Sequence, residues 1–256
     1  MPLPNFKAGQ YLSLSIPLSN RRIKRAYSLA AWKKTPFYYE LGIKKEDTGV
    51  GSSWLWENMQ TGKSLLASLP TGHFTCNTAA NRLVFIAGGI GITPLRAMLH
   101  HFLDQQKRGQ NKDSKIFLFY SNSYQEDVIF HQEFIKIAQK TPDFTYIPIV
   151  TRATAADNWQ GETQRISVAT LRHYVGNFDN TAFYMCANND LMHKLENALL
   201  TEGVEKTKIH YESFGISAVS AVENDGYFRR TWGDFSFETA STPTLFPCPR
   251  NRRLRL

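Results

Sequence analysis

The stretch LVFIAGGIGITPLRAML, residues 83–99, decides how the second half of this chain folds. It opens with four apolar residues, a pattern typical of a short strand buried on both faces of a parallel sheet. Three glycines follow within four positions, and Thr93 and Pro94 then suit the N-cap and the first position of a helix. Free backbone amides and the helix dipole converge at such a turn, so the stretch predicts a site for the phosphates of a dinucleotide. The third glycine of the Rossmann pattern is absent, so a glycine-rich connection that binds nothing stays open at this point.

The composition limits the class of protein. The chain has 256 residues, 42% hydrophobic and 20% charged, as in ordinary globular proteins. It has no apolar run of the roughly 18 residues that a membrane span requires and no signal-peptide pattern. Its three cysteines are odd in number and too widely spaced for a disulfide framework. We therefore expect a protein of the reducing cytoplasm that spans no membrane.

The net charge of +8 raises the question of nucleic-acid binding. Four arginines in the last seven residues equal half of this surplus, and four more basic residues gather at 21–25. Neither patch comes with a recognition-helix, zinc-finger or RNP pattern, which disfavours a nucleic-acid partner. A solvated basic face, or a site for an anionic cofactor and an acidic partner protein, is the favoured interpretation.

The rhythm of apolar residues divides the chain into two parts. Up to about residue 80, alternating patterns predict short strands of a small antiparallel barrel, at 10–16, 26–30, 37–43 and 65–69, with a short helix at 54–59. From about residue 81 a parallel sheet is predicted, with strands at 83–87, 116–120, 144–150, 182–186 and 209–212 and helices at 94–106, 128–139, 168–175 and 191–201. The residues beyond Gly215 follow neither pattern. The predicted fold class is therefore β-barrel plus α/β, with an open parallel sheet.

Two further stretches hold residues suited to anions. In RAYS, residues 25–28, alternation places Arg25 and Tyr27 on one face, so that a cation for phosphate lies beside a flat ring. GVGS, residues 49–52, opens a helix with free amides and with Ser52 as its cap. Taken alone, each also has a plain explanation, as a packed tyrosine beside a surface arginine and as a simple helix start.

In order along the chain, the motifs are RAYS at 25–28, GVGS at 49–52, PTGHF at 70–74, the glycine stretch at 83–99, the strand end at Cys186 and ESFG at 212–215. In the order of these motifs, the chain resembles the ferredoxin–NAD(P)H reductase superfamily. More specifically, the chain resembles the flavin reductase components of bacterial oxygenases such as phenol hydroxylase and benzoate dioxygenase, and the resemblance covers residues 6–215. The resemblance implies a flavin-binding barrel over residues 1–80 and an NAD(P)-binding α/β domain over residues 81–215. It also implies an oxidoreductase that takes hydride from NAD(P)H onto a flavin and passes single electrons to a ferredoxin or oxygenase.

The resemblance further implies roles for individual residues. Ser28, Cys186 and Glu212 would be catalytic, around the reacting atoms of the flavin and the nicotinamide. The residues implied to bind cofactor are Arg25, Tyr27, Ser28, Lys44, Gly49, Gly51, Ser52 and Phe214 for the flavin and its phosphates, and Gly88, Gly89, Gly91, Thr93 and Pro94 for the dinucleotide. FAD is expected rather than FMN. Ser123 stands where many relatives carry an arginine, which favours NADH over NADPH, although Arg152 on the next strand end is placed to compensate.

Three features depart from the family. Ala187-Asn188-Asn189 replaces the usual Gly-Pro after Cys186, with asparagines that suit a turn and a helix cap. One or two strands that relatives place before Phe6 are missing, so an incomplete barrel of poor stability is expected. The tail at 216–256 has a single cysteine, Cys248, where a plant-type ferredoxin domain would need four, so a disrupted ferredoxin domain without an iron–sulfur cluster or other metal is expected. A catalytically inactive remnant that at most binds nucleotide remains the alternative.

Overall fold

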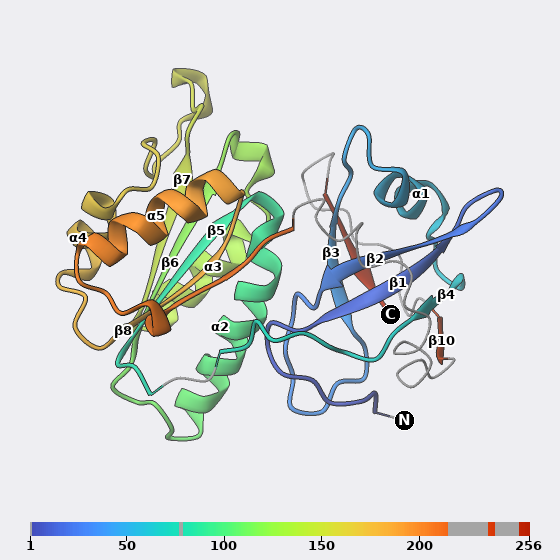
Figure 1. Ribbon diagram of the computed structural model, residues 1–256, viewed down its shortest axis with the longest axis horizontal. Helices are drawn as coiled ribbons and strands as arrows, with labels where there is room; N and C mark the ends of the chain where they lie inside the picture. Colours follow the sequence, from blue (N-terminus) through green and yellow to red (C-terminus); the bar gives the residue numbers. More distant parts are fainter. Residues whose placement is uncertain (1, 77–78, 215–234, 239–250) are drawn as a thin grey trace.

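The computed structural model describes residues 2–76, 79–214, 235–238 and 251–256. Figure 1 shows two lobes side by side, antiparallel strands in one and a parallel sheet flanked by helices in the other. We call them the barrel lobe and the nucleotide lobe. Their order along the chain is the predicted one. In the described parts of the chain, no helix combines the length and the apolar content needed to cross a bilayer.

The barrel lobe is built from short antiparallel strands. Its elements in the first part of the chain are β1 (Tyr11–Pro17), β2 (Arg22–Ser28), β3 (Glu40–Lys44), α1 (Val50–Asn58) and β4 (Ser64–Ala67). β1 pairs with β2 along its whole length and with β4 at Leu14 and Ser15, while a bridge from Leu29 to Leu41 connects to β3. Leu12, Leu14 and Ile16 alternate along β1 and are fully buried, as expected of a half-buried strand.

Two strands from the end of the chain join this lobe. β10 (Phe235–Glu238) pairs with β4, and β11 (Asn251–Arg255) pairs with β3, both antiparallel. The sequence predicted neither strand, because pairing to an open sheet edge is a long-range event that leaves little local pattern. Cys248, on which the expectation of a disrupted ferredoxin domain depends, lies outside the described residues.

The nucleotide lobe contains a five-stranded parallel sheet in the order β7-β6-β5-β8-β9. Its strands are β5 (Arg82–Gly88), β6 (Lys115–Asn122), β7 (Phe144–Val150), β8 (Thr181–Cys186) and β9 (Ile209–Glu212). Its α-helices are α2 (Ile92–Lys107), α3 (His131–Lys140), α4 (Val168–Val175) and α5 (Asn189–Thr201). The predicted order of strands and helices is confirmed, and the bounds of β7, α4 and β9 agree residue for residue.

Helices cover both faces of this sheet. Leu83 and Phe85 of β5 belong to one core cluster, with residues of α2 and α3, whereas Val84 and Ile86 belong to a second, with residues of α4 and α5. Burial on both faces explains why β5 reads as an unbroken apolar run.

Two predicted helix caps are wrong. α2 follows the 3-10 turn Gly89–Gly91 and is capped at Gly91, so Thr93 lies in the first turn and its hydroxyl donates to the Ile90 carbonyl oxygen (3.0 Å). Ser52 also lies inside its helix, where its hydroxyl donates to the Gly49 carbonyl oxygen (3.0 Å). The local sequence favoured both residues as caps. In the fold both are buried, and each hydroxyl donates to a carbonyl oxygen three residues earlier instead of capping the helix. Asn188 does cap α5, because its side chain accepts from the Leu191 amide (2.9 Å).

Candidate functional site

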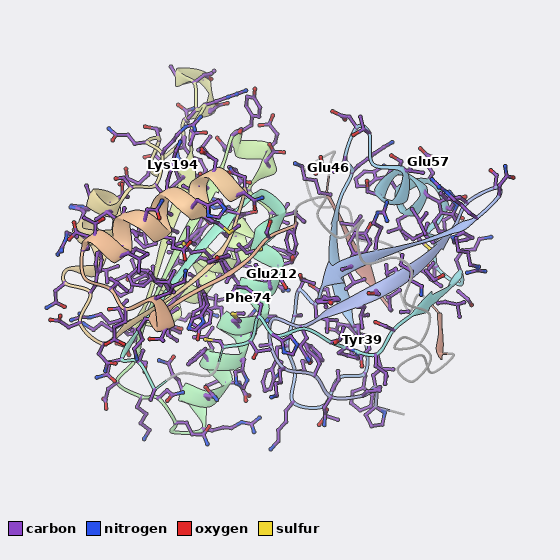
Figure 2. All side chains as sticks on the ribbon, viewed as in Figure 1. Tyr39, Glu46, Glu57, Phe74, Lys194 and Glu212 are labelled. Carbon is purple, nitrogen blue, oxygen red and sulfur yellow. The ribbon has the colours of Figure 1, made fainter. Side chains whose placement is uncertain are left out.

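One contact between the two lobes joins the end of β2 to the end of β9. The Ser28 hydroxyl of the barrel lobe donates to Glu212 Oε2 of the nucleotide lobe across 3.4 Å. Cys186 is the register partner of Glu212 on the neighbouring strand and is fully buried. Figure 2 labels Glu212 between the lobes. The structure thus brings together the three residues that the sequence predicted to be catalytic.

Burial changes the pKa values of two of these residues, Glu212 and Cys186. Burial raises the pKa of Glu212 to about 7, against the opposing effect of the hydrogen bond from Ser28. The Glu212 carboxyl can therefore hold or release a proton near neutral pH. Burial, together with the charge of Glu212, raises the pKa of Cys186 well above its ordinary value. The Cys186 thiol thus stays protonated and is no nucleophile.

The glycine loop after β5 packs tightly against the end of β8. A side chain at Gly91 would overlap the Cys186 carbonyl group, and a Cβ atom at Gly88 would lie 2.8 Å from Ala187 Cβ. Gly89 has a φ of +53° and nothing within 4 Å of the place a Cβ atom would take. The loop therefore approaches the predicted catalytic trio closely, while Gly89 borders open space. Backbone amides at the start of α2 suit a phosphate there.

Thr93 and Pro94 play a different part in this loop. Both side chains are buried, and the Thr93 methyl group faces the backbone of Gly42 on β3. Contact with a phosphate at Thr93 would have to come from its backbone amide, and Pro94 has no amide N–H to donate. The Thr93 side chain instead packs the loop against β3 of the barrel lobe.

A second group of predicted residues gathers around the start of α1. A Cβ atom at Gly51 would lie 3.2 Å from Arg25 Cγ, so the exposed arginine lies over the first turn of this helix, which contains no acidic residue. Tyr27, two residues along β2, is partly buried, and burial raises the pKa of its hydroxyl to about 12 despite the nearby charge of Arg25. A cation, a helix start and a neutral flat ring fit the pyrophosphate and the ring system of a flavin dinucleotide.

The remaining residues predicted to bind the flavin lie in α1, at the end of β3 and after β9. Ser52 is held inside α1, with Gly49 as the helix cap. Lys44, at the end of β3, forms an ion pair with Glu46 (3.3 Å). Phe214 follows β9 with a ring that is about half exposed. In the described residues, no group of three or more His, Cys, Asp or Glu side chains is arranged to hold a metal ion.

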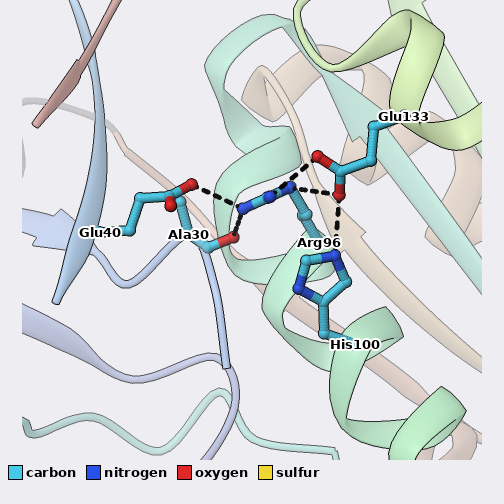
Figure 3. A network of polar contacts seen from close by, with 5 residues as sticks. All are labelled: Ala30, Glu40, Arg96, His100 and Glu133. Carbon is cyan, nitrogen blue, oxygen red and sulfur yellow. Dashed lines mark hydrogen bonds and ion pairs between the residues drawn. The ribbon is translucent and has the colours of Figure 1, made fainter. Parts of the chain in front are cut away.

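The sequence reading missed a buried ion network beside the site. Glu40, Arg96, His100 and Glu133 are joined by hydrogen bonds across the boundary between the lobes (Figure 3), and we call them the seam network. The only sequence clue is an arginine in an otherwise apolar helix start, residues 92–99. Its acidic partners lie 56 and 37 residues away, so no local pattern could identify them.

Comparisons with known proteins support this reading of the two lobes. Residues 4–76 match the oxidoreductase FAD-binding domain and residues 85–197 the oxidoreductase NAD-binding domain. The FAD/NAD-binding domain of nitric oxide dioxygenase from Vibrio cholerae superposes with a TM-score of 0.69 at 28% identity, covering 84% of this chain and 87% of that one. The predicted fold class and the predicted cofactors, FAD and a nicotinamide dinucleotide, are thereby confirmed.

Several of the curated relatives are reductase components of monooxygenases. The chain is 27% identical over 212 residues to the glycine betaine monooxygenase reductase subunit of Chromohalobacter salexigens. It is 30% identical over 212 residues to the ferredoxin reductase component of 3-ketosteroid-9-alpha-monooxygenase from Rhodococcus rhodochrous. In both cases the match covers 82% of this chain and 56% of the relative, so the chain spans little more than half their length.

Proposed function

We infer that the chain, in which an FAD-binding domain is joined to an NAD-binding domain, belongs to the ferredoxin reductase-like oxidoreductases, and we propose that it is an NAD(P)H-dependent flavoprotein reductase. Its electrons would pass to a ferredoxin or oxygenase component, as the names of the two curated relatives suggest. The observation that carries the proposal is the Ser28–Glu212 contact across the lobes. It brings the predicted flavin side of the barrel lobe against the strand ends of the nucleotide lobe.

The chain's own residues would divide the work. Arg25 and the start of α1 would bind the pyrophosphate, Tyr27 would pack on the flavin ring, and the glycine loop would hold the dinucleotide through its backbone. Bound FAD supplies the redox chemistry, accepting two electrons together from NAD(P)H and releasing them singly. The Glu212 carboxyl, with its pKa of about 7, would hold a proton near the bound flavin, and Ser28 would orient that carboxyl through its hydrogen bond to Oε2. Cys186, buried and protonated, excludes water from the end of β8.

We propose NADH as the preferred donor. Ser123 offers no cation for a 2′-phosphate. Arg152 is the nearest candidate: its amide donates to the Ser123 carbonyl oxygen (3.0 Å), but its guanidinium donates to the Tyr124 hydroxyl (2.9 Å). Titration with NADH and NADPH tests this preference. If Arg152 does recognise the 2′-phosphate, Arg152→Gln will weaken NADPH binding and leave NADH binding unchanged.

One experiment tests the central proposal. The purified protein, reconstituted with FAD or FMN, is scanned in the visible range and then titrated with NADH without oxygen. Flavin bands that appear with FAD and bleach with one equivalent of NADH support the reductase, and FMN should bind more weakly. Protein that takes up neither flavin but still binds NADH would instead establish the inactive remnant. The cytoplasm remains the proposed compartment.

A further inference from the structure

We propose that Arg96 is a positioning residue for hydride transfer: by joining Glu40 of the barrel lobe to Glu133 of the nucleotide lobe, it fixes the two lobes at their reacting distance. The proposal rests on the proposed function, since it concerns the geometry of that same site. It assigns a role to residues that neither the motifs nor the domain matches single out.

The barrel-lobe side of the seam network is dry. Arg96 Nη1 donates to the Ala30 carbonyl oxygen (2.6 Å) and to Glu40 Oε1 (2.8 Å). The Ala30 amide in turn donates to the Glu40 carbonyl oxygen (2.7 Å), so both acceptors belong to one paired part of the barrel. The side chain of Glu40 is 0% exposed and that of Arg96 4%. Water therefore cannot replace either partner of this pair.

The nucleotide-lobe side fixes the same guanidinium from the opposite direction. Arg96 Nε and Nη2 each donate to one carboxylate oxygen of Glu133 at 2.9 Å, and His100 Nε2 lies 2.8 Å from Glu133 Oε1 (Figure 3). Burial alone would raise the pKa of Glu133, but the hydrogen bond from His100 and the charge of Arg96 outweigh it and hold the pKa at about 2. The centroid of the Phe130 ring lies 4.2 Å from the guanidinium carbon. Arg96 is thus held in one orientation on α2.

The seam network is connected to the candidate site through short stretches of chain. Ala30 is two residues beyond Ser28, and Arg96 is one helical turn beyond Thr93 in the glycine-loop stretch. Between them, a Cβ atom at Gly42 would lie only 2.5 Å from Thr93 Cγ2, so β3 and the start of α2 are in close contact. A shift between Arg96 and Glu40 would therefore move the glycine loop relative to Ser28. Because hydride transfer needs reacting atoms about 3–3.5 Å apart, a displacement of about 1 Å can cost about a hundredfold in rate.

The two carboxylates differ in a way that makes the proposal testable. Glu133 is 30% exposed and lines a cavity of about 450 Å³ together with His100, so water can replace its charge beside Arg96. Glu40 has no such access. Glu40→Gln and Glu133→Gln are equally conservative, but only the first weakens a contact that crosses between the lobes. The control is Arg172→Gln, which breaks an ion pair to Glu202 within the nucleotide lobe, far from the seam.

The first readout separates binding from hydride transfer by anaerobic stopped-flow mixing of the FAD-loaded protein with NADH. Glu40→Gln is expected to slow flavin bleaching about tenfold or more, while the NADH dissociation constant stays within about threefold. Glu133→Gln should lose less than about threefold in rate, and Arg172→Gln none. Arg96→Lys, which keeps the charge but cannot bridge both carboxylates, should also slow bleaching. Equal rate losses in Glu40→Gln and Glu133→Gln, or bleaching of Glu40→Gln and Arg96→Lys at the parent rate, would overturn the proposal.

The second readout needs no flavin and no turnover. In scanning calorimetry, lobes joined by the seam network unfold in one transition, whereas Glu40→Gln should divide it into two and Glu133→Gln should not. A single transition in both Glu40→Gln and Arg96→Lys would count against coupling through Arg96. If the parent fails to bind flavin, the proposed function fails, but this measurement still decides whether the seam network joins the lobes.

Discussion

Among single residues, Glu212 links the fold to pH. Its pKa of about 7 lies above the ordinary 4.5, so between these values the unfolded chain binds fewer protons than the folded one. The free energy of unfolding must therefore fall as pH rises from about 4.5 to 7, by an amount of order 2 kcal/mol after allowance for partial exposure. Glu212→Gln stays neutral and should not show this loss. Urea titrations of the flavin-free protein at pH 5 and pH 8 check it, and parallel curves for parent and variant would contradict the assignment.

Arg25 is the residue on which flavin affinity should depend most directly. A charge-assisted contact to phosphate contributes about 1.5–3 kcal/mol, so Arg25→Gln should weaken FAD binding by about 10- to 100-fold. Arg22→Gln removes the same charge from the same exposed strand and should change the affinity less than about twofold. Fluorescence titration with FAD measures both. Equal losses would mean that the basic strand attracts the cofactor only through its overall charge.

For the loop between β5 and α2, close approach matters more than backbone freedom at Gly91. Its φ of −59° is open to any residue, but a Cβ atom there would overlap the Cys186 carbonyl group. Gly91→Ala should therefore lower the free energy of unfolding by about 3 kcal/mol. Gly89→Asn is the matched control, because asparagine tolerates a left-handed φ and the space is open, and it should lose about 1 kcal/mol or less. Denaturant midpoints compare the two variants, and a tolerated Gly91→Ala would show that the loop sits further from β8.

The strand β11 can be tested through Leu256, which follows it directly. Leu256 is 3% exposed in the barrel core, and its backbone exchanges hydrogen bonds of 2.8 Å with Tyr39 in both directions. Leu256→Ala should cost about 2–4 kcal/mol of stability. Leu200→Ala, at a leucine that is 38% exposed, should cost well under half as much. Thermal melts of the two variants decide, and equal melting temperatures would argue against the pairing of β11 with β3.

At the scale of the whole molecule, the seam network makes stability depend on a contact between lobes. Arg96→Met leaves the fully buried Glu40 without its cation, a change that costs about 3–5 kcal/mol. Arg96→Met combined with Glu40→Leu removes both buried charges and should recover most of the loss. Chemical denaturation of the single and double variants measures this. A double variant no more stable than Arg96→Met would show that the loss comes from packing rather than from the stranded carboxylate.

Much of the fold is local and could be predicted. Which faces of an element are buried determines its sequence pattern: the apolar run of β5, the alternation in β1 and the helical spacing of α4. The motifs at residues 70–74 and 212–215 added to the resemblance through their order along the chain. The helix caps at Thr93 and Ser52 were predicted wrongly, because both residue types also occur in the first turn of a helix when packing buries them. The pairing of β10 and β11 could not be predicted, since the partner of an edge strand depends on which segment lies beside it in the folded protein and not on the local sequence.

The sequence by itself determined the two-lobe class, the order of its elements and the residues suited to phosphate, because periodicity and glycine placement are local properties of the chain. Only the tertiary structure brought Ser28, Cys186 and Glu212 together and joined Glu40 through Arg96 to Glu133. Those contacts connect residues that are far apart in sequence. Burial raises the pKa of Glu212 and excludes water from the Arg96–Glu40 pair, and this burial exists only once the lobes have packed.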